Sequence, residues 1–182
     1  LGIMRYNGAS WESVTSLPEN PSTDTLSFAI DKNNNLFISY SVNRGSFPTW
    51  RIYAKYDGSN WHYGEYRIVR IGSGRLPTAV ALDSNGTLYA GAQCLSGCTF
   101  QKINSSGGAV SLGSFGSGYT KSLSFVVDDN DHLYAAYRDD DGKLTVQKYD
   151  GLGWSVVGTA KFSTGEVSYV SIALDSNDSP YV

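Results

Sequence analysis

The sequence has few charged residues, few histidines and no long apolar run, and each shortage excludes a class of function. Charged residues make up 17% of the chain, and 14 Lys and Arg against 17 Asp and Glu give a net charge of −3. Nucleic-acid binding needs a basic patch, and the sequence contains none. Apolar stretches such as 125–127 are only a few residues long, whereas a membrane-spanning helix needs about 20. We therefore expect neither nucleic-acid binding nor membrane insertion.

Strong helix formers are also scarce, and glycine and aromatic residues take their place. The chain contains 20 Gly, 13 Tyr and 4 Trp among its 182 residues. Aromatic and β-branched residues favour strands, while Gly, Asn and Asp favour the tight turns that join strands. The composition therefore predicts an all-β protein, and the length predicts a single domain with a sizeable core.

Two sequence patterns recur in step along the chain. One is a turn that starts with aspartate directly after an apolar strand, at Asp31, Asp83, Asp128 and Asp175. The other is a segment that reads Tyr-Asp-Gly-x-x-Trp in its fullest form, at 6–11, 56–61, 103–106 and 149–154. Both patterns return at intervals of 45 to 52 residues, a period that is typical of β-propeller blades.

Each repeat contains four short strands, and the first of them carries a pattern of its own. These first strands are expected at 25–30, 78–82, 123–127 and 169–174. Small and large apolar side chains alternate along them without any charge, so both faces are expected to be buried. We therefore assign this strand to the crowded centre of the propeller.

Four-stranded antiparallel blades in a β-propeller are the predicted architecture. The chain is expected to form one domain over 1–182, with repeats at about 3–50, 51–98, 99–144 and 145–182. Because the sequence opens on a third strand and closes on a second, we expect three whole blades and one blade split two-and-two between the chain ends.

Three arrangements of the two half-blades are open. The ends could meet within one molecule and close a four-bladed ring. They could pair with a neighbouring molecule through their unpaired strand edges, giving larger rings or fibres. Alternatively, the chain could be part of a longer propeller.

The sequence resembles the extracellular propeller repeats of bacteria and archaea. The segments that carry the resemblance best are Leu174–Val182, an apolar strand end followed by an aspartate turn, and Lys148–Trp154, the Tyr-Asp-Gly-x-x-Trp turn. Some bacterial propeller lectins have a similar turn, so the resemblance implies sugar binding as one function. The Asp box of sialidase propellers does not match, because Asp83 and Gly86 are three residues apart.

Catalytic and metal-binding patterns are weak. His62 and His132 are isolated from one another in the sequence, and no serine or cysteine triad spacing accompanies them. Zinc, which takes about four nitrogen or sulfur ligands, is therefore not expected. Calcium is the one cofactor that turns such as Asp128, Asn130 and Asp131 could hold, but hairpin turns use the same residues and no later acidic ligand follows. We predict no enzyme activity, no catalytic residue and no metal.

The two cysteines lie close together, at Cys94 and Cys98. A disulfide that closes a small hairpin loop is the favoured interpretation, and two free thiols are the alternative. A disulfide would imply an oxidising compartment, which predicts an extracellular or cell-surface location.

Turns on one face of the predicted propeller are nearly uniform, whereas the loops on the other face differ from repeat to repeat. Variable loops on a rigid scaffold commonly carry binding residues. The candidate ligand-binding residues are Arg44, Phe47, Trp50, Trp61, Arg67, Arg70, Arg138 and Asp139. The repeated Tyr and Trp of the second pattern either stack on sugar rings or pack between neighbouring blades.

These observations predict a non-enzymatic extracellular binding or adhesion module that recognises a glycan or a protein. The first alternative is a structural protein that assembles through its half-blade ends. The second alternative is a fragment of a propeller glycoside hydrolase.

Overall fold

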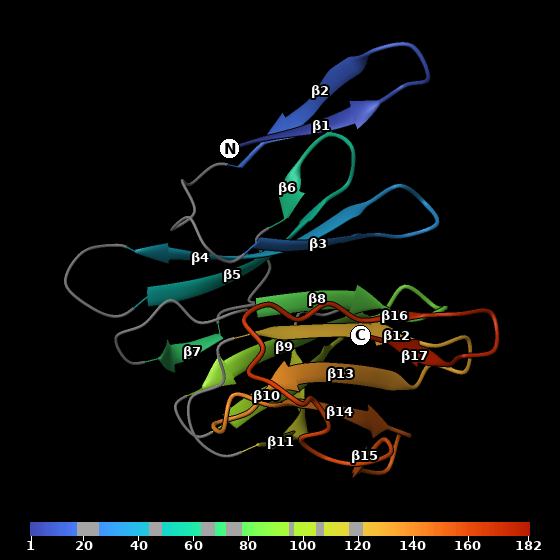
Figure 1. The fold of residues 1–182 in the computed structure, drawn as a ribbon. Helices are drawn as coiled ribbons and strands as arrows, with labels where there is room; N and C mark the ends of the chain where they lie inside the picture. Colours follow the sequence, from blue (N-terminus) through green and yellow to red (C-terminus); the bar gives the residue numbers. More distant parts are fainter. Residues whose placement is uncertain are drawn as a thin grey trace.

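The computed structural model is built from antiparallel β-sheets that follow one another along an open arc (Figure 1). It describes residues 1–17, 26–43, 49–62, 68–71, 78–94, 97–104, 108–116 and 122–182. No helix occurs in these ranges, and nothing in them is a helix long and apolar enough to cross a membrane. The predicted all-β class is confirmed.

Three four-stranded blades follow one another in the described part of the chain. Blade 1 contains β3 (Leu26–Ile30), β4 (Leu36–Asn43), β5 (Thr49–Tyr56) and β6 (Trp61–His62), and β7 (Ile68–Ile71) also pairs with β5. Blade 2 contains β8 (Thr78–Leu82), β9 (Leu88–Cys94), β10 (Gly97–Ile103) and β11 (Ala109–Phe115). Blade 3 contains β12 (Leu123–Val127), β13 (Leu133–Arg138), β14 (Leu144–Tyr149) and β15 (Trp154–Val156).

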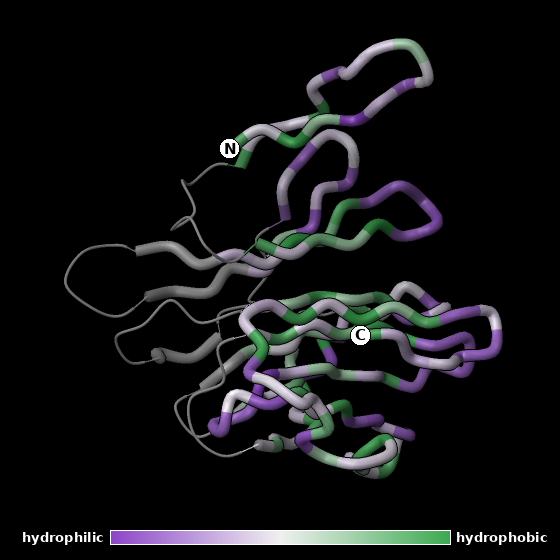
Figure 2. Tube along the Cα trace, viewed as in Figure 1, coloured by the Kyte–Doolittle hydropathy of each residue, from purple (hydrophilic) through white to green (hydrophobic). Residues whose placement is uncertain are grey.

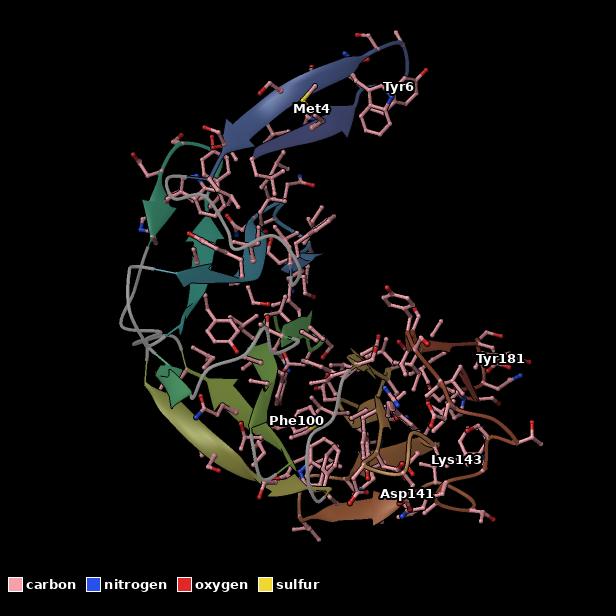
Figure 3. All side chains as sticks on the ribbon, turned by 60° about the vertical axis from the view of Figure 1, so that its left-hand side comes forward. Met4, Tyr6, Phe100, Asp141, Lys143 and Tyr181 are labelled. Atoms are coloured by element: carbon pink, nitrogen blue, oxygen red, sulfur yellow. The ribbon has the colours of Figure 1, made fainter. Side chains whose placement is uncertain are left out.

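The half-blades at the two ends are separate two-stranded sheets. The N-terminal hairpin contains β1 (Gly2–Tyr6) and β2 (Trp11–Ser16), and the C-terminal hairpin contains β16 (Ala173–Leu174) and β17 (Pro180–Tyr181). They lie at opposite ends of the arc and do not share a sheet (Figures 1 and 3). The prediction of three whole blades and one split blade is confirmed, but the closed four-bladed ring is not formed.

The turn after each first strand is shaped by its aspartate. In blade 3, the Asp128 carboxylate accepts the backbone N–H groups of Asn130 at 2.9 Å and of His132 at 2.8 Å. The chain then needs one residue with a positive φ, and Asp131 takes φ 63°. Asn, Asp and Gly tolerate this conformation best, which explains why they recur at this position.

These hydrogen bonds make the stability of the fold depend on pH. Burial raises the pKa of Asp128, but the hydrogen bonds from His132 and Asn130 outweigh it and hold the pKa below the ordinary value of 3.8. A carboxyl with a lowered folded pKa stabilises the fold fully above its unfolded pKa and loses that contribution as the pH falls through the folded pKa. The melting temperature should therefore decrease as the pH is lowered below 3.8. In thermal unfolding scans, Asp128→Asn should be less stable at neutral pH and less sensitive to acid, whereas exposed Asp129→Asn should behave as the parent.

The core lies between the blades rather than within one of them. The inner strands contact one another in sequence, β3 with β8, β8 with β12 and β12 with β16, which confirms the central position predicted for them. Hydrophobic stretches run along the strands, and hydrophilic residues gather in the turns at their ends (Figure 2). Between blades 2 and 3, Phe100, Phe115 and Phe125 form the centre of the largest cluster. The apolar layers therefore join each blade to the next.

One inner strand is shorter than expected. The segment 169–174 was expected to be a strand, but only Ala173–Leu174 is paired, with β17. Its large residue Ile172 is buried against blade 3, whereas Ser171 and Ala173 on the other face are exposed. The segment therefore packs on blade 3 with one face and exposes the other.

Candidate functional site

The variable-loop residues expected to bind a ligand are only partly described. Arg44, Phe47 and Arg67 lie outside the described residues. Trp50 and Arg70 lie in β5 and β7, where the backbone is described but not the side chains. As ligand-binding residues, these five stay predictions.

Arg138 and Asp139 lie at the end of β13, in a group of charged side chains. The Arg138 guanidinium lies 3.3 Å from the Glu166 carboxylate. Asp139 is buried and accepts the backbone N–H of Lys143 at 2.8 Å, so it shapes the turn into β14. Both residues therefore already have structural partners, and a role in ligand binding stays a prediction.

The carboxylates of the acidic run 139–141 lie around one lysine. Their oxygens lie within 4.8 Å of one another. The Lys161 ammonium is in an ion pair with Asp141 and lies 3.9 Å from Asp139. The lysine offsets part of the negative charge, so a cation at this group would compete with the ammonium, and the expectation of no metal stays a prediction.

Both histidines are paired with aspartates of the repeated turns. His62 Nε2 lies 2.5 Å from the Asp57 carboxylate, and His132 Nδ1 lies 2.9 Å from the Asp128 carboxylate. The backbone N–H of Asn60 and the His62 ring hold the pKa of Asp57 well below its usual range. Each pair therefore joins two residues that are close in the sequence, and the expectation that neither histidine is catalytic stays a prediction.

The repeated tryptophans pack between neighbouring sheets. The indole N–H of Trp154 in blade 3 donates to the carbonyl oxygen of Leu112 in blade 2 at 2.8 Å. The indole N–H of Trp61 in blade 1 donates to the Thr15 hydroxyl and the Ser16 carbonyl oxygen of the N-terminal hairpin, each at 3.1 Å. Of the two interpretations of these aromatics, packing between blades is the one that the contacts support.

Cross-strand pairs of a lysine and an aromatic residue recur in every whole blade, and the sequence analysis missed them. Each pair joins the second strand of a blade to its third. The ammonium-to-ring distances are 5.6 Å for Lys55 over Phe37, 5.5 Å for Lys102 over Tyr89 and 4.7 Å for Lys148 over Tyr134. Strand register places the members of each pair directly opposite one another. An alignment of the four repeats by their turns would have revealed the pattern.

A groove between blades 1 and 2 contains one of these pairs, Lys55 with Phe37, and the lysine of a second pair, Lys102. It has a volume of about 400 Å³. Its lining consists of three apolar residues, two ammonium groups, two carboxamides and turn backbone: Phe37, Leu88 and Ile103, then Lys55 and Lys102, then Asn85 and Asn104, then Gly86 and Thr87. The groove therefore combines apolar and hydrogen-bonding groups, and none of the residues that line it is acidic.

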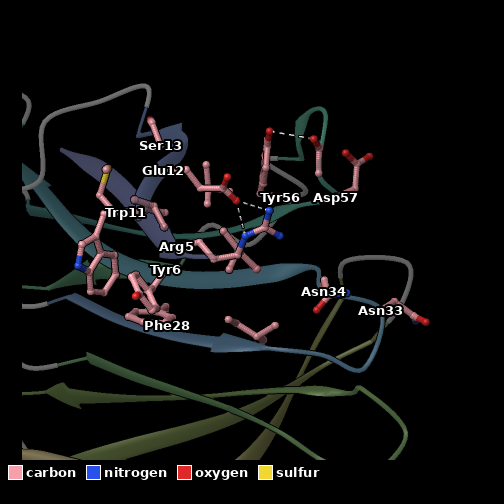
Figure 4. Close-up of a pocket in the computed structure, with 16 residues that line it drawn as sticks. Arg5, Tyr6, Trp11, Glu12, Ser13, Phe28, Asn33, Asn34, Tyr56 and Asp57 are labelled. Atoms are coloured by element: carbon pink, nitrogen blue, oxygen red, sulfur yellow. Dashed lines mark hydrogen bonds and ion pairs between the residues drawn. The ribbon is translucent and has the colours of Figure 1, made fainter. Parts of the chain in front are cut away.

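A larger cleft of about 710 Å³ separates the N-terminal hairpin from blade 1 (Figure 4). Its lining includes the exposed apolar residues Phe28 and Ile30 of β3 and the aromatic pair of Tyr6 and Trp11, whose ring centroids are 5.6 Å apart. The Arg5 guanidinium donates to the Glu12 carboxylate with Nε at 2.8 Å.

The predicted disulfide between Cys94 and Cys98 is not shown. The register of the β9–β10 hairpin pairs Cys94 with Gly97 and Cys98 with Gln93, so the cysteines are not directly opposite one another. Cys98 is buried in the core between blades 2 and 3, and the side chain of Cys94 is outside the described part. The disulfide stays a prediction.

Comparison with known proteins supports the architecture. No protein-family model and no curated protein matches the chain. Among solved structures, the six-bladed fungal lectin of Aleuria aurantia, which recognises fucose, superposes with a TM-score of 0.67 and 21% identity, over 94% of this chain and 59% of the lectin. The fold is a β-propeller. A fucose lectin from Kordia zhangzhouensis, solved with methyl-fucoside, has a TM-score of 0.51 and 15% identity, over 74% of this chain and 99% of that lectin.

The same fold is shared with an enzyme. The GH43 protein BlXynB from Bacillus licheniformis superposes with a TM-score of 0.53 and 13% identity, over 93% of this chain and 40% of the enzyme. The propeller chain described here therefore spans less than two thirds of the Aleuria lectin and of BlXynB. Propellers host many functions, so the activity has to be argued from the site.

Proposed function

We propose that this chain is a non-enzymatic carbohydrate-binding propeller module that holds a glycan in the groove between blades 1 and 2. The observation that carries the proposal is the lining of that groove. Phe37, the lysines Lys55 and Lys102 and the asparagines Asn85 and Asn104 all line it, and the Lys55 ammonium lies 5.6 Å from the centre of the Phe37 ring.

Sugar chemistry matches this arrangement. A pyranose has an apolar face of C–H groups and a rim of hydroxyls that both donate and accept hydrogen bonds. Apolar pockets with a few convergent polar groups are typical ligand sites, and the groove has both parts. Lysine ammonium groups donate only, whereas asparagine carboxamides donate and accept, so together they can satisfy several hydroxyls.

The solved propellers suggest the first sugar to try. The Aleuria aurantia and Kordia zhangzhouensis proteins are lectins that bind fucose or methyl-fucoside. A fucoside is therefore the first probe for this chain.

A hydrolase function is less well supported. The carboxylates of 139–141 lie together, but Lys161 lies among them and Asp139 is buried in the structure of its turn. A glycosidase needs two carboxylates that flank the substrate, one of which acts as an acid. We therefore propose binding without turnover, at an extracellular or cell-surface location where glycans are presented.

Binding should be tested by isothermal titration calorimetry with methyl α-L-fucoside. If that sugar does not bind, a broad glycan array should follow. Lys102→Ala should weaken the binding of the recognised sugar about 10- to 100-fold, because a hydrogen bond to a charged donor contributes about 1.5–3 kcal/mol. Lys102 lies over the Tyr89 ring and is only half-buried, so its loss should leave the fold intact.

Lys32→Ala provides the control. Lys32 is an exposed lysine of the β3–β4 turn and does not line the groove, so its removal tests the effect of charge alone. Equal losses in the two variants, or no glycan bound by the parent chain, would contradict the proposed site.

A further inference from the structure

We propose that the groove between blades 1 and 2 selects an acidic sugar, a pyranose whose sulfate or carboxylate group contacts the ammonium groups of Lys55 and Lys102. This inference rests on the proposed function, because it names the class of glycan that the same groove takes. It also goes beyond the similar lectins, which are described with fucose or methyl-fucoside, sugars that have no charged group.

The lining of the groove carries positive charge without a matching negative charge. Two of its nine residues are the lysines Lys55 and Lys102, and none is an aspartate or a glutamate. The lysines come from different blades, and both are half-buried. Among the described residues, neither ammonium forms an ion pair with a carboxylate. A groove lined by charge of one sign concentrates ligands of the opposite sign, so this lining favours an anion.

The equivalent lysine of blade 3 has an anionic partner inside the protein. Lys148 lies 3.5 Å from the buried Asp128 carboxylate and 2.7 Å from the Tyr134 hydroxyl. In blade 1 the aromatic residue opposite the lysine is Phe37, which has no hydroxyl. Lys55 lies 5.6 Å from the centre of the Phe37 ring, a contact that leaves its positive charge in place. Phenylalanine at this position therefore removes a hydrogen-bond partner that Lys148 has and Lys55 lacks.

An asparagine in the repeated turn of blade 2 removes a carboxylate from the groove. Asp57 in blade 1 and Asp150 in blade 3 begin the turn between the third and fourth strands, and each accepts two backbone N–H groups. In blade 2 the same turn begins at Asn104, which lines the groove and accepts the N–H of Gly108 at 2.6 Å. The carboxamide keeps the acceptor oxygen that the turn needs but carries no charge. An aspartate here would put a negative charge in the same lining as Lys102.

The aspartates of the turns after β3 and β8 do not fill the place of a ligand anion. Asp31 accepts the backbone and side-chain N–H groups of Asn35, at 2.9 and 2.7 Å. Asp83 accepts the backbone N–H groups of Asn85 at 3.0 Å and of Thr87 at 2.7 Å. Neither aspartate lines the groove. Their charges reduce the positive potential from a distance and leave both ammonium groups facing the groove without an ion-pair partner.

An acidic pyranose matches the whole lining and not the lysines alone. A sulfate or carboxylate oxygen accepts from an ammonium in a charge-assisted hydrogen bond, which is roughly twice as strong as one between neutral groups. The C–H face of the ring can lie on Phe37, and the hydroxyls can bond the carboxamides of Asn85 and Asn104. Sulfate and carboxylate share this chemistry, so both kinds of sugar belong in the test.

Isothermal titration calorimetry should compare sugars that differ in one charged group. The pairs are methyl α-L-fucoside with its monosulfated form, and methyl β-D-glucoside with methyl β-D-glucuronide. We expect the charged member of at least one pair to bind about 10-fold tighter, because it gains charge-assisted hydrogen bonds. The preference should shrink between about 0.05 M and about 0.5 M salt, since salt screens partly exposed charges. The pair that shows the preference identifies sulfate or carboxylate as the recognised group.

Variants of the two lysines locate the charge that is recognised. Lys55→Gln and Lys102→Gln should each remove most of the preference for the charged sugar, whereas Lys102→Arg, which keeps the charge, should retain it. Lys32→Gln makes the same change at an exposed turn residue outside the groove and should leave the preference unchanged. The two sugars of a pair are compared on the same variant, so partial unfolding would lower both affinities and leave their ratio unchanged.

The outcomes separate this inference from the proposed function. Equal binding of neutral and charged sugars by the parent chain, with both weakened by Lys102→Ala, would overturn the inference and leave the proposed glycan site in place. A preference that Lys32→Gln reduces as much as Lys102→Gln would also overturn it. If none of the four sugars binds, the neutral and acidic members of a glycan array provide the same comparison, and no binding there would overturn both proposals.

Discussion

Replacing Phe100 with alanine should lower the free energy of unfolding by about 3–5 kcal/mol, the usual cost of deleting a buried aromatic ring. Phe100 is 1% exposed and lies at the centre of the core between blades 2 and 3. Its ring is stacked on Phe115 at 4.9 Å, meets the edge of Phe125 at 5.6 Å and lies 4.6 Å from Trp154. The deletion removes contacts on both blades at once, and chemical denaturation followed by circular dichroism would measure the loss.

Phe162→Ala gives the comparison for the same change of side chain. Phe162 is nearly half exposed, so its truncation should cost well under 1 kcal/mol. Similar losses for the two phenylalanines would contradict a core that is concentrated between the blades.

Gly91 allows the same cluster to be tested by adding a methyl group instead of removing a ring. A Cβ at Gly91 would lie 2.7 Å from an edge atom of the Phe100 ring and 3.0 Å from one of Phe125. Gly91→Ala should therefore cost about 1–3 kcal/mol through overpacking. In a Phe100→Ala background most of that cost should disappear, so the two changes should be far from additive.

Replacing Trp154 with alanine should cost about 3 kcal/mol, whereas the same change at Trp11 should cost almost nothing. The two residues occupy the same position of the repeat. Trp154 packs on Phe100 and Phe115 and donates its indole N–H to Leu112. Trp11 is 68% exposed, and the ring contact that the structure gives it is with Tyr6 of its own hairpin, 5.6 Å away.

The comparison of Trp154 with Trp11 separates packing from ligand binding. If the repeated tryptophan served mainly to bind ligand, Trp154→Ala would leave the unfolding midpoint unchanged and weaken binding instead. Unfolding should be measured by chemical denaturation followed by circular dichroism. An equal loss of stability at the two positions would contradict the interblade role.

The sequence by itself determined the architecture of each blade. The aspartate turns and the Tyr-Asp-Gly-x-x-Trp segments are local: their hydrogen bonds join residues a few positions apart, such as Asp128 with His132. Local chemistry of this kind can be read from spacing alone. The alternation of small and large residues along each inner strand is also local, and it is enough to identify that strand as the central one.

How the repeats pack against one another could be learned only from the tertiary structure. Trp61 and Trp154 share a motif with Trp11, yet only the first two are held by a preceding sheet, because packing depends on a neighbour more than 40 residues away. The groove likewise joins Phe37 to Lys102 from different blades, so no local pattern marks it. The two half-blades lie apart because the sheets follow an open arc. The rotation from one blade to the next depends on how the large side chains of one inner strand pack on the small side chains of its neighbour, and no single repeat determines that rotation.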